Sequence, residues 1–135
     1  MATVPIRGVE LAYDRRGVGP DFVWGHGLTS SIESEDELGL FDFDTIRGVA
    51  TVLRYDARGH GRSGATPDSA GYHWRALAED QLALADQLGV GSYVAGGASM
   101  GAASALHAAV MAPVRIRGLV LVIPPTARET RAAQT

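Results

Sequence analysis

The chain has 135 residues, a formal net charge of −3 and no cysteine, and this length suggests about one domain. Its 46% hydrophobic and 20% charged residues are typical of a globular protein. Its negative net charge favours neither nucleic acid nor an anionic membrane as a partner. The lack of cysteine excludes disulfides and cysteine-based sites. No secretory signal pattern opens the chain, and the longest apolar run, residues 119–123, is too short to span a membrane, so we expect a cytoplasmic protein. We also expect no metal and no cofactor.

The first part of the chain predicts strands. Residues 4–15 form two short strands that meet at Gly8, because apolar and polar residues alternate along 9–14. Residues 16–20 predict a turn, and residues 22–24 predict a short buried strand. This pattern is typical of an edge ribbon that leads into a sheet.

An acidic stretch comes next. Ser34 and Glu37 fit a capping box, which predicts a short helix interrupted near Gly39. We expect its carboxylates to lie on a solvated face. Residues 50–56 predict an internal strand, followed by a glycine-rich loop over 57–71.

The second half alternates helices and strands. Residues 72–88 carry an apolar helical stripe, with Glu79, Asp80 and Asp86 away from it. A strand at 92–95 precedes an alanine-rich helix that Pro113 ends. Residues 119–123 form a continuous apolar run, typical of a strand buried on both faces. The whole order predicts an α/β fold with a mainly parallel sheet.

A glycine-bracketed serine stands between that strand and the alanine-rich helix. Gly97-Ala98-Ser99-Met100-Gly101 fits G-x-S-x-G, the nucleophile elbow, in which a sharp turn presents the serine hydroxyl. Glycine on both sides leaves the space that such a turn requires, because it has no Cβ. The helix points its N-terminal amides and its positive dipole end toward Ser99. This context predicts a catalytic nucleophile rather than an ordinary serine at a helix entrance.

Two more glycine-rich segments follow predicted strands, Trp-Gly-His-Gly-Leu-Thr at 24–29 and Tyr-Asp-Ala-Arg-Gly-His-Gly-Arg-Ser at 55–63. With the elbow, they make the chain resemble the α/β-hydrolase fold family. The first is similar to the H-G oxyanion loop after the family's third strand, and the second to the D-x-R-G-x-G-x-S segment after its fourth. The resemblance implies the N-terminal half of that fold, a partial domain over 1–135 with about six strands.

The resemblance also implies an activity, that of a serine hydrolase acting on a small-molecule carboxylic ester, lactone or related acyl compound. Ser99 would attack the acyl carbonyl, and the backbone amides of Leu28 and Met100 would hold the oxyanion. A serine nucleophile argues against relatives that need an aspartate, such as dehalogenases and epoxide hydrolases. Gly27 is expected to need a close backbone approach. The motif residues with a structural role are Gly25, His26, Gly27, Asp56, Arg58, Gly59, Gly61, Gly97 and Gly101.

The triad acid and histidine should follow the serine in this fold. His107 lies on the same helix as Ser99, about 12 Å along its axis and out of hydrogen-bond reach. The other histidines, at positions 26, 60 and 73, are expected to be structural. Glu129 is the only acid after Ser99, and we expect it to belong to a polar tail. The sequence therefore predicts a nucleophile and an oxyanion site without a complete triad.

Three readings of such a chain stay open at this point. It is a truncated enzyme, a non-catalytic remnant or binding module, or a half-domain completed by another polypeptide. In the family's strand order a further strand lies beside residues 119–123. Without that strand the apolar run would lie at the sheet edge, so we expect self-association through it.

Overall fold

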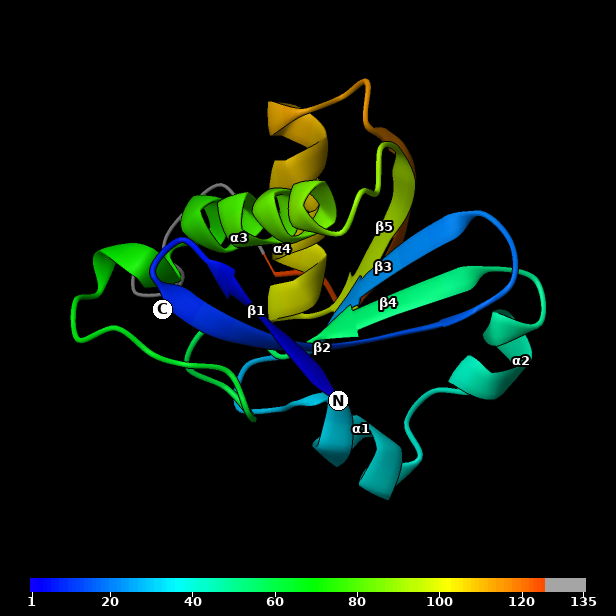
Figure 1. The fold of residues 1–135 in the computed structure, drawn as a ribbon, viewed down its shortest axis with the longest axis horizontal. Helices are drawn as coiled ribbons and strands as arrows, with labels where there is room; N and C mark the ends of the chain where they lie inside the picture. The colour runs from blue at the N-terminus through cyan, green and yellow to red at the C-terminus, as the bar shows by residue number, and fades with distance from the viewer. Residues whose placement is uncertain (126–135) are drawn as a thin grey trace.

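A six-stranded sheet with helices on both sides forms the centre of the molecule in the computed structural model, which describes residues 1–125 (Figure 1). The strand order is β1-β2-β4-β3-β5-β6. The first two pairings, β1 with β2 and β2 with β4, are antiparallel, and the other three are parallel. The α/β fold with a mostly parallel sheet is thus confirmed. The strands are β1 Ala2–Ile6, β2 Val9–Gly17, β3 Asp21–Gly25, β4 Thr51–Tyr55, β5 Tyr93–Ala98 and β6 Ile116–Val122.

The helices connect these strands and differ in size. Two short helices lie between β3 and β4, a 3₁₀ turn and a long helix lie between β4 and β5, and one helix lies between β5 and β6. None of the helices within residues 1–125 is long and apolar enough to cross a membrane. They are α1 Ile32–Leu38, α2 Phe43–Arg47, η1 Ala70–Tyr72, α3 Trp74–Gln87 and α4 Met100–Met111.

The two faces of the sheet carry separate cores. Figure 1 shows α3 and α4 on one side of the sheet and α1 and α2 on the other. The α3–α4 side buries the larger core, which includes Leu11, Val23, Leu53, Leu84 and Tyr93. The opposite side has a smaller core of Phe22, Trp24, Phe43 and Val52.

Some predicted boundaries were wrong. β2 continues to Gly17, so the turn after it is shorter than expected. The N-cap of α1 is Ser31, whose Oγ accepts from the Ser34 N–H at 3.0 Å, and not Ser34 itself. Sequence reasoning missed α2, whose cap is Asp42, because this helix has only 5 residues and shows no full apolar period.

The expectation of a solvated acidic stretch is wrong for Glu35. Its carboxylate is buried, accepts from Trp24 Nε1 at 3.1 Å and pairs with Arg54 at 3.2 Å. Burial raises the pKa of Glu35, and the bonds from Trp24 and Arg54 oppose that shift. Asp80, which was expected to lie away from the apolar stripe of its helix, is also buried, against Arg58. In both cases an arginine from a distant part of the chain compensates the buried charge.

The strand β6 lies at the sheet edge. Its residues were expected, from the apolar run alone, to be buried on both faces, but Leu119 is 40% and Val120 45% exposed. The physical reason is the strand order, which places β5 on one side of β6 and no strand of residues 1–125 on the other. The edge position agrees with what the resemblance implied.

Candidate active site

Ser99 lies at the junction of β5 and α4, where the chain reverses direction. Its φ of 52° and ψ of −109° place a non-glycine residue in a strained region of backbone space, which costs of the order of 1–3 kcal/mol. Two backbone hydrogen bonds hold it there, from Ser99 N–H to the Val122 carbonyl at 2.9 Å and from Ala103 N–H to the Ser99 carbonyl at 3.1 Å. The serine thus has the strained strand-to-helix geometry of a nucleophile elbow.

The glycines on both sides of Ser99 permit a close backbone approach. A Cβ at Gly97 would overlap the backbone of Gly101 and Ala102, and a Cβ at Gly101 would overlap the backbone of Gly25. Gly25 ends β3, which pairs with β5 so that Gly25 faces Gly97. The steric interpretation of the G-x-S-x-G pattern is therefore correct, with the end of β3 as the neighbour that requires it.

The loop after β3 faces the serine. A Cβ built on Gly27 would lie 3.8 Å from Ser99 Cβ and 3.6 Å from the Ala98 carbonyl oxygen, which are ordinary contacts. The close approach expected at Gly27 is instead found at Gly25, whose Cβ would lie 3.0 Å from Gly101 Cα. Gly27 borders the space in front of Ser99 without being compressed there.

The two amides predicted to hold an oxyanion flank this space in sequence. Met100 opens α4 with a buried side chain, and Leu28 follows Gly27 with its side chain 41% exposed. Within residues 1–125 neither backbone N–H donates a hydrogen bond. The first amide of a helix has no partner inside its own helix and lies at the positive dipole end, so it suits an anion. Their joint role as an oxyanion hole stays a prediction.

His26 is a structural residue. The N–H of Ala57 donates to Nε2 at 2.9 Å, which leaves the proton on Nδ1, and Nδ1 donates to the Gly27 carbonyl at 2.7 Å. The ring is 2% exposed, and burial lowers its pKa. Both nitrogens are committed, so His26 joins the loop after β3 to the loop after β4 and is not placed to act as a base.

The other three histidines lie in three different parts of the fold. His60 packs its ring 5.1 Å from that of His26, with Nδ1 2.9 Å from the Arg58 carbonyl. His73 precedes α3 as its N-cap residue, and His107 lies within α4. No side chain among residues 1–125 makes a hydrogen bond with the Ser99 hydroxyl. Glu129 lies outside the described residues.

The Asp56–Ser63 loop, which follows β4, is held by its own polar side chains. Asp56 Oδ1 accepts from the Ile32 N–H at 2.8 Å, and Oδ2 accepts from the Arg62 N–H at 3.0 Å. Ser63 Oγ donates to the Asp56 carbonyl at 2.6 Å and accepts from the Ala12 N–H at 2.9 Å. This loop therefore fixes the start of α1, β2 and its own turn together.

Arg58 and the two loop glycines complete that arrangement. Arg58 forms a two-pronged ion pair with Asp80 on α3, Nε to Oδ2 and Nη2 to Oδ1, both at 3.0 Å. Gly59 and Gly61 have positive φ values of 76° and 50°, and a Cβ at Gly61 would overlap the Asp56 carboxylate. Sequence reasoning missed Asp80 as the partner of Arg58. The available signal was the position of Asp80 beside the apolar stripe of α3, where a buried carboxylate needs a cationic partner.

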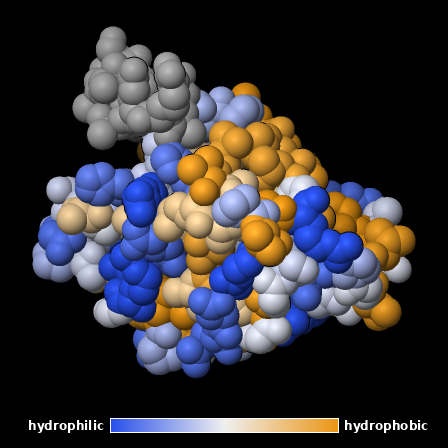
Figure 2. Space-filling view, turned by 90° about the horizontal axis from the view of Figure 1, so that it is seen from above, coloured by the Kyte–Doolittle hydropathy of each residue, from blue (hydrophilic) through white to orange (hydrophobic). Residues whose placement is uncertain are grey.

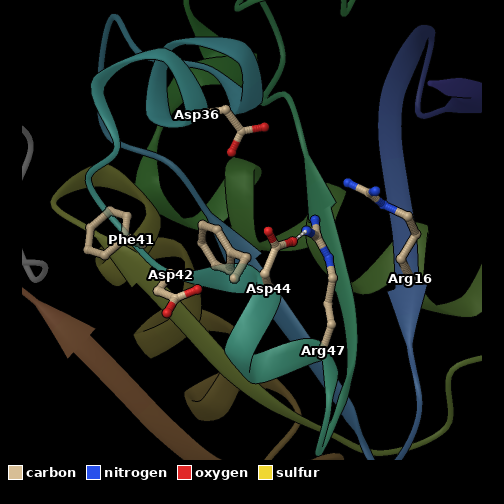
Figure 3. A pocket seen from close by; sticks show the side chains of 7 residues that line it. Arg16, Asp36, Phe41, Asp42, Asp44 and Arg47 are labelled. Carbon is tan, nitrogen blue, oxygen red and sulfur yellow. Dashed lines mark hydrogen bonds and ion pairs between the residues drawn. The ribbon is translucent and has the colours of Figure 1, made fainter.

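A pocket of about 420 Å³ lies elsewhere, beside α2 (Figure 3). Its charged groups pair with one another or with neighbours, as Arg47 does with Asp44 at 3.0 Å and Asp36 with Arg54 at 2.8 Å. No lining residue belongs to the elbow or to the two loops near it, so this pocket is separate from Ser99. The lining residues are Arg16, Asp36, Phe41, Asp42, Phe43, Asp44 and Arg47. The described residues also hold no group of three or more His, Asp or Glu side chains that suits a metal ion.

The strained serine, its glycine neighbours and the strand order define one class of protein. The family model for the alpha/beta hydrolase fold matches residues 12–134. The chain belongs to the alpha/beta hydrolase fold family.

Individual relatives agree with this assignment. An alpha/beta hydrolase from Sphaerobacter thermophilus has 34% identity and a TM-score of 0.75, over 92% of this chain and 45% of its own. An epoxide hydrolase from Vigna radiata has 27% identity and a TM-score of 0.75, over 89% of this chain and 38% of its own. A dihydrolipoyllysine-residue acetyltransferase component of an acetoin cleaving system, from Cupriavidus necator, is 31% identical over 88% of this chain and 30% of its own. The chain thus spans less than half the length of each relative.

Proposed function

We propose that this chain supplies the nucleophile and oxyanion site of a cytoplasmic serine hydrolase that cleaves a carboxylic ester, lactone or related acyl compound. The observation that carries the proposal is the strained Ser99, held at φ 52° between β5 and α4 with its hydroxyl uncommitted within residues 1–125. Backbone strain of this kind is retained where it serves a function.

The proposed reaction begins with attack of Ser99 Oγ on the acyl carbon. The C–O bond to the leaving group breaks after a tetrahedral intermediate, whose oxyanion accepts hydrogen bonds from the Leu28 and Met100 amides. The serine proton passes to a base and then to the leaving alcohol, and water later releases the acyl group with its proton returned to Ser99. A serine at this position supports acyl transfer over the epoxide hydrolysis named for the Vigna radiata relative.

The proton acceptor must come from outside the groups described above. His26 has both ring nitrogens in use, and the Ser99 hydroxyl has no side-chain partner within residues 1–125. A serine hydroxyl without a base is a poor nucleophile at neutral pH. Two sources of such a base fit this observation: a further part of the same protein, since the chain spans less than half the length of each relative, and a second polypeptide that completes the half-domain. A non-catalytic binding module is the remaining alternative.

A fluorophosphonate probe with and without imidazole tests these readings. We expect slow labelling of the 135-residue chain, and a rate that rises at least ten-fold when imidazole is added as an external base. Ser99→Ala should abolish both rates, and Ser69→Ala, which changes an exposed loop serine, should leave both unchanged. Labelling that survives Ser99→Ala contradicts the nucleophile. Absence of labelling even with imidazole supports the binding module instead.

A further inference from the structure

The contacts that bury His26 come from residues 1–125 themselves. Its ring is 2% exposed and reaches from the loop after β3 to the loop after β4. Exposed apolar residues, by contrast, form a patch on the α3–α4 side of the molecule (Figure 2). The environment of His26 is thus internal to the described chain, whereas that patch faces outward.

The Gly27 carbonyl is the group that His26 holds. His26 Nδ1–H donates to this oxygen at 2.7 Å, and the N–H of Ser30 donates to it at 3.1 Å. The carbonyl of Gly27 and the N–H of Leu28 belong to one peptide group, which is planar and trans, so the two bonds point in opposite directions. The contacts that fix the direction of the Gly27 carbonyl therefore also fix the direction of the Leu28 N–H.

The turn that contains this peptide is strained. The hydrogen bond from Ser30 closes a four-residue turn that begins at Gly27, and Thr29 takes its third position with a φ of 63°. A positive φ at that position normally requires glycine, and a residue in such a sparsely populated region costs about 1–3 kcal/mol. The second hydrogen bond to the Gly27 carbonyl, from His26, opposes rearrangement of this turn.

The ring of His26 is itself anchored at its other nitrogen. The N–H of Ala57, a buried residue, donates to Nε2 at 2.9 Å. This bond requires an unprotonated Nε2, so the neutral ring carries its proton on Nδ1, the nitrogen that faces the Gly27 carbonyl. Hydrogen bonds in such a chain polarise one another, which makes the Leu28 N–H at its end a better donor. Within residues 1–125 that N–H has no acceptor.

We propose that His26 is a positioning residue for the oxyanion site: it holds the Gly27 carbonyl so that the Leu28 N–H of the same peptide points at the substrate oxygen. This inference rests on the proposed function, which assigns the Leu28 amide to the oxyanion. In this role His26 transfers no proton and touches no substrate. It acts through the Gly27–Leu28 peptide, and its bond to Ala57 keeps the ring in place.

Two amide substitutions separate the bond to Gly27 from the bond to Ala57. In His26→Asn the side-chain nitrogen can take the place of Nδ1 and donate to the Gly27 carbonyl, but no group reaches Ala57. In His26→Gln the longer side chain offers an acceptor to the Ala57 N–H at the place of Nε2, but no donor to Gly27. A positioning role therefore ranks Asn above Gln, whereas a purely structural link between the two loops ranks Gln above Asn.

The readout is labelling of Ser99 in the 135-residue chain by the fluorophosphonate probe, at one fixed pH and imidazole concentration. His26→Gln should lower the maximal labelling rate about ten-fold or more, because complete loss of one oxyanion donor costs roughly 10²–10³. His26→Asn should stay within about three-fold of the parent, since it keeps the donor to Gly27. The probe concentration at half-maximal rate should not change, because the probe binds before the oxyanion forms.

His60→Gln is the matched control, because the ring of His60 packs beside that of His26 but its Nδ1 lies against the Arg58 carbonyl instead. It should label as the parent does. Equal losses in the two His26 variants, a larger loss in His26→Asn, or the same loss in His60→Gln would overturn the proposal and leave Ser99 as the nucleophile. A parent chain that is not labelled at Ser99 contradicts the proposed function, and the positioning role with it.

Ring ¹⁵N chemical shifts of the parent chain decide the point if circular dichroism shows that a His26 variant is unfolded. The proton is expected on Nδ1, where it donates to the Gly27 carbonyl. A proton on Nε2 would mean that the ring does not hold this carbonyl, and the proposal would be wrong.

Discussion

The elbow at Gly97–Gly101 and the Asp56–Ser63 loop are both glycine-rich turns at the carboxyl ends of parallel strands, but they use their polar groups in opposite ways. In the Asp56–Ser63 loop, Asp56, Arg58 and Ser63 all make hydrogen bonds to other parts of the fold. In the elbow, the Ser99 hydroxyl makes none within residues 1–125, although its backbone is strained. Two similar sequence motifs therefore have different physical tasks.

The difference separates a hydroxyl that stabilises the fold from one that has no hydrogen-bond partner within residues 1–125. A hydroxyl that both donates and accepts within the fold, as Ser63 does, contributes to stability and is unavailable for chemistry. The strained backbone of Ser99 lowers the stability of the folded state, and other interactions of the fold must offset that loss. The predictions below test this contrast.

The largest effect is expected for Gly101→Ala in the elbow. The new Cβ would overlap the Gly25 carbonyl, and both neighbours are backbone that cannot rotate away. Overpacking of this kind should lower the free energy of unfolding by about 3 kcal/mol or more, against the small gain that alanine normally brings to a helix. Urea unfolding followed by tryptophan fluorescence measures it.

Gly91→Ala is the matched control for that variant. Gly91 has no atom within 4 Å of its added Cβ and no positive φ, so its stability should stay within about 0.5 kcal/mol of the parent. Equal stability of the two variants would contradict the close approach between β3 and α4.

The paired variants Ser63→Ala and Ser99→Gly should change stability in opposite directions. Ser63→Ala leaves the Ala12 N–H without its partner and should cost about 1–3 kcal/mol. Ser99→Gly relieves a positive φ and should gain about 1 kcal/mol, with loss of probe labelling. Thermal and urea unfolding measure both. A loss of stability in Ser99→Gly would show that the elbow serine is structural after all.

The elements of this fold follow largely from local patterns. Strand alternation, the apolar stripe of α3 and the glycines around Ser99 each reflect a few neighbouring residues, and these predictions were confirmed in their main outline. The elbow was predictable for the same reason, because the steric demand of the turn is met by Gly97 and Gly101 themselves.

What local patterns could not give were contacts between distant residues. Glu35 is buried because Trp24 and Arg54 surround it, and nothing within the acidic stretch indicates that. The one available signal was Arg54 itself, a charge inside an otherwise apolar strand, which requires a buried partner. The hydrogen bond from the Ala57 N–H to the His26 ring is a further example, because only the folded loops bring these two residues together.

The smallest expected effect, a pH dependence of stability, comes from His26, which joins the two loop systems. Burial lowers the pKa of His26 from 6.5 in the folded protein, so below that value the unfolded chain binds more protons. The free energy of unfolding should therefore fall as the pH drops from 7 to 6, because protonation of this imidazole favours the unfolded chain.

His26→Gln isolates this contribution, because it keeps an acceptor for the Ala57 N–H and removes the titration. The raised pKa of Glu35 acts in the opposite direction, since that carboxyl favours the protonated folded state as pH falls, but it is present in both proteins and cancels in the difference. Urea unfolding at pH 6 and pH 7 should show a steeper loss for the parent than for the variant. Parallel pH profiles would mean that the pKa of His26 is the same in the folded and the unfolded protein. The ring would then not be held by two hydrogen bonds as the Ser63 hydroxyl is.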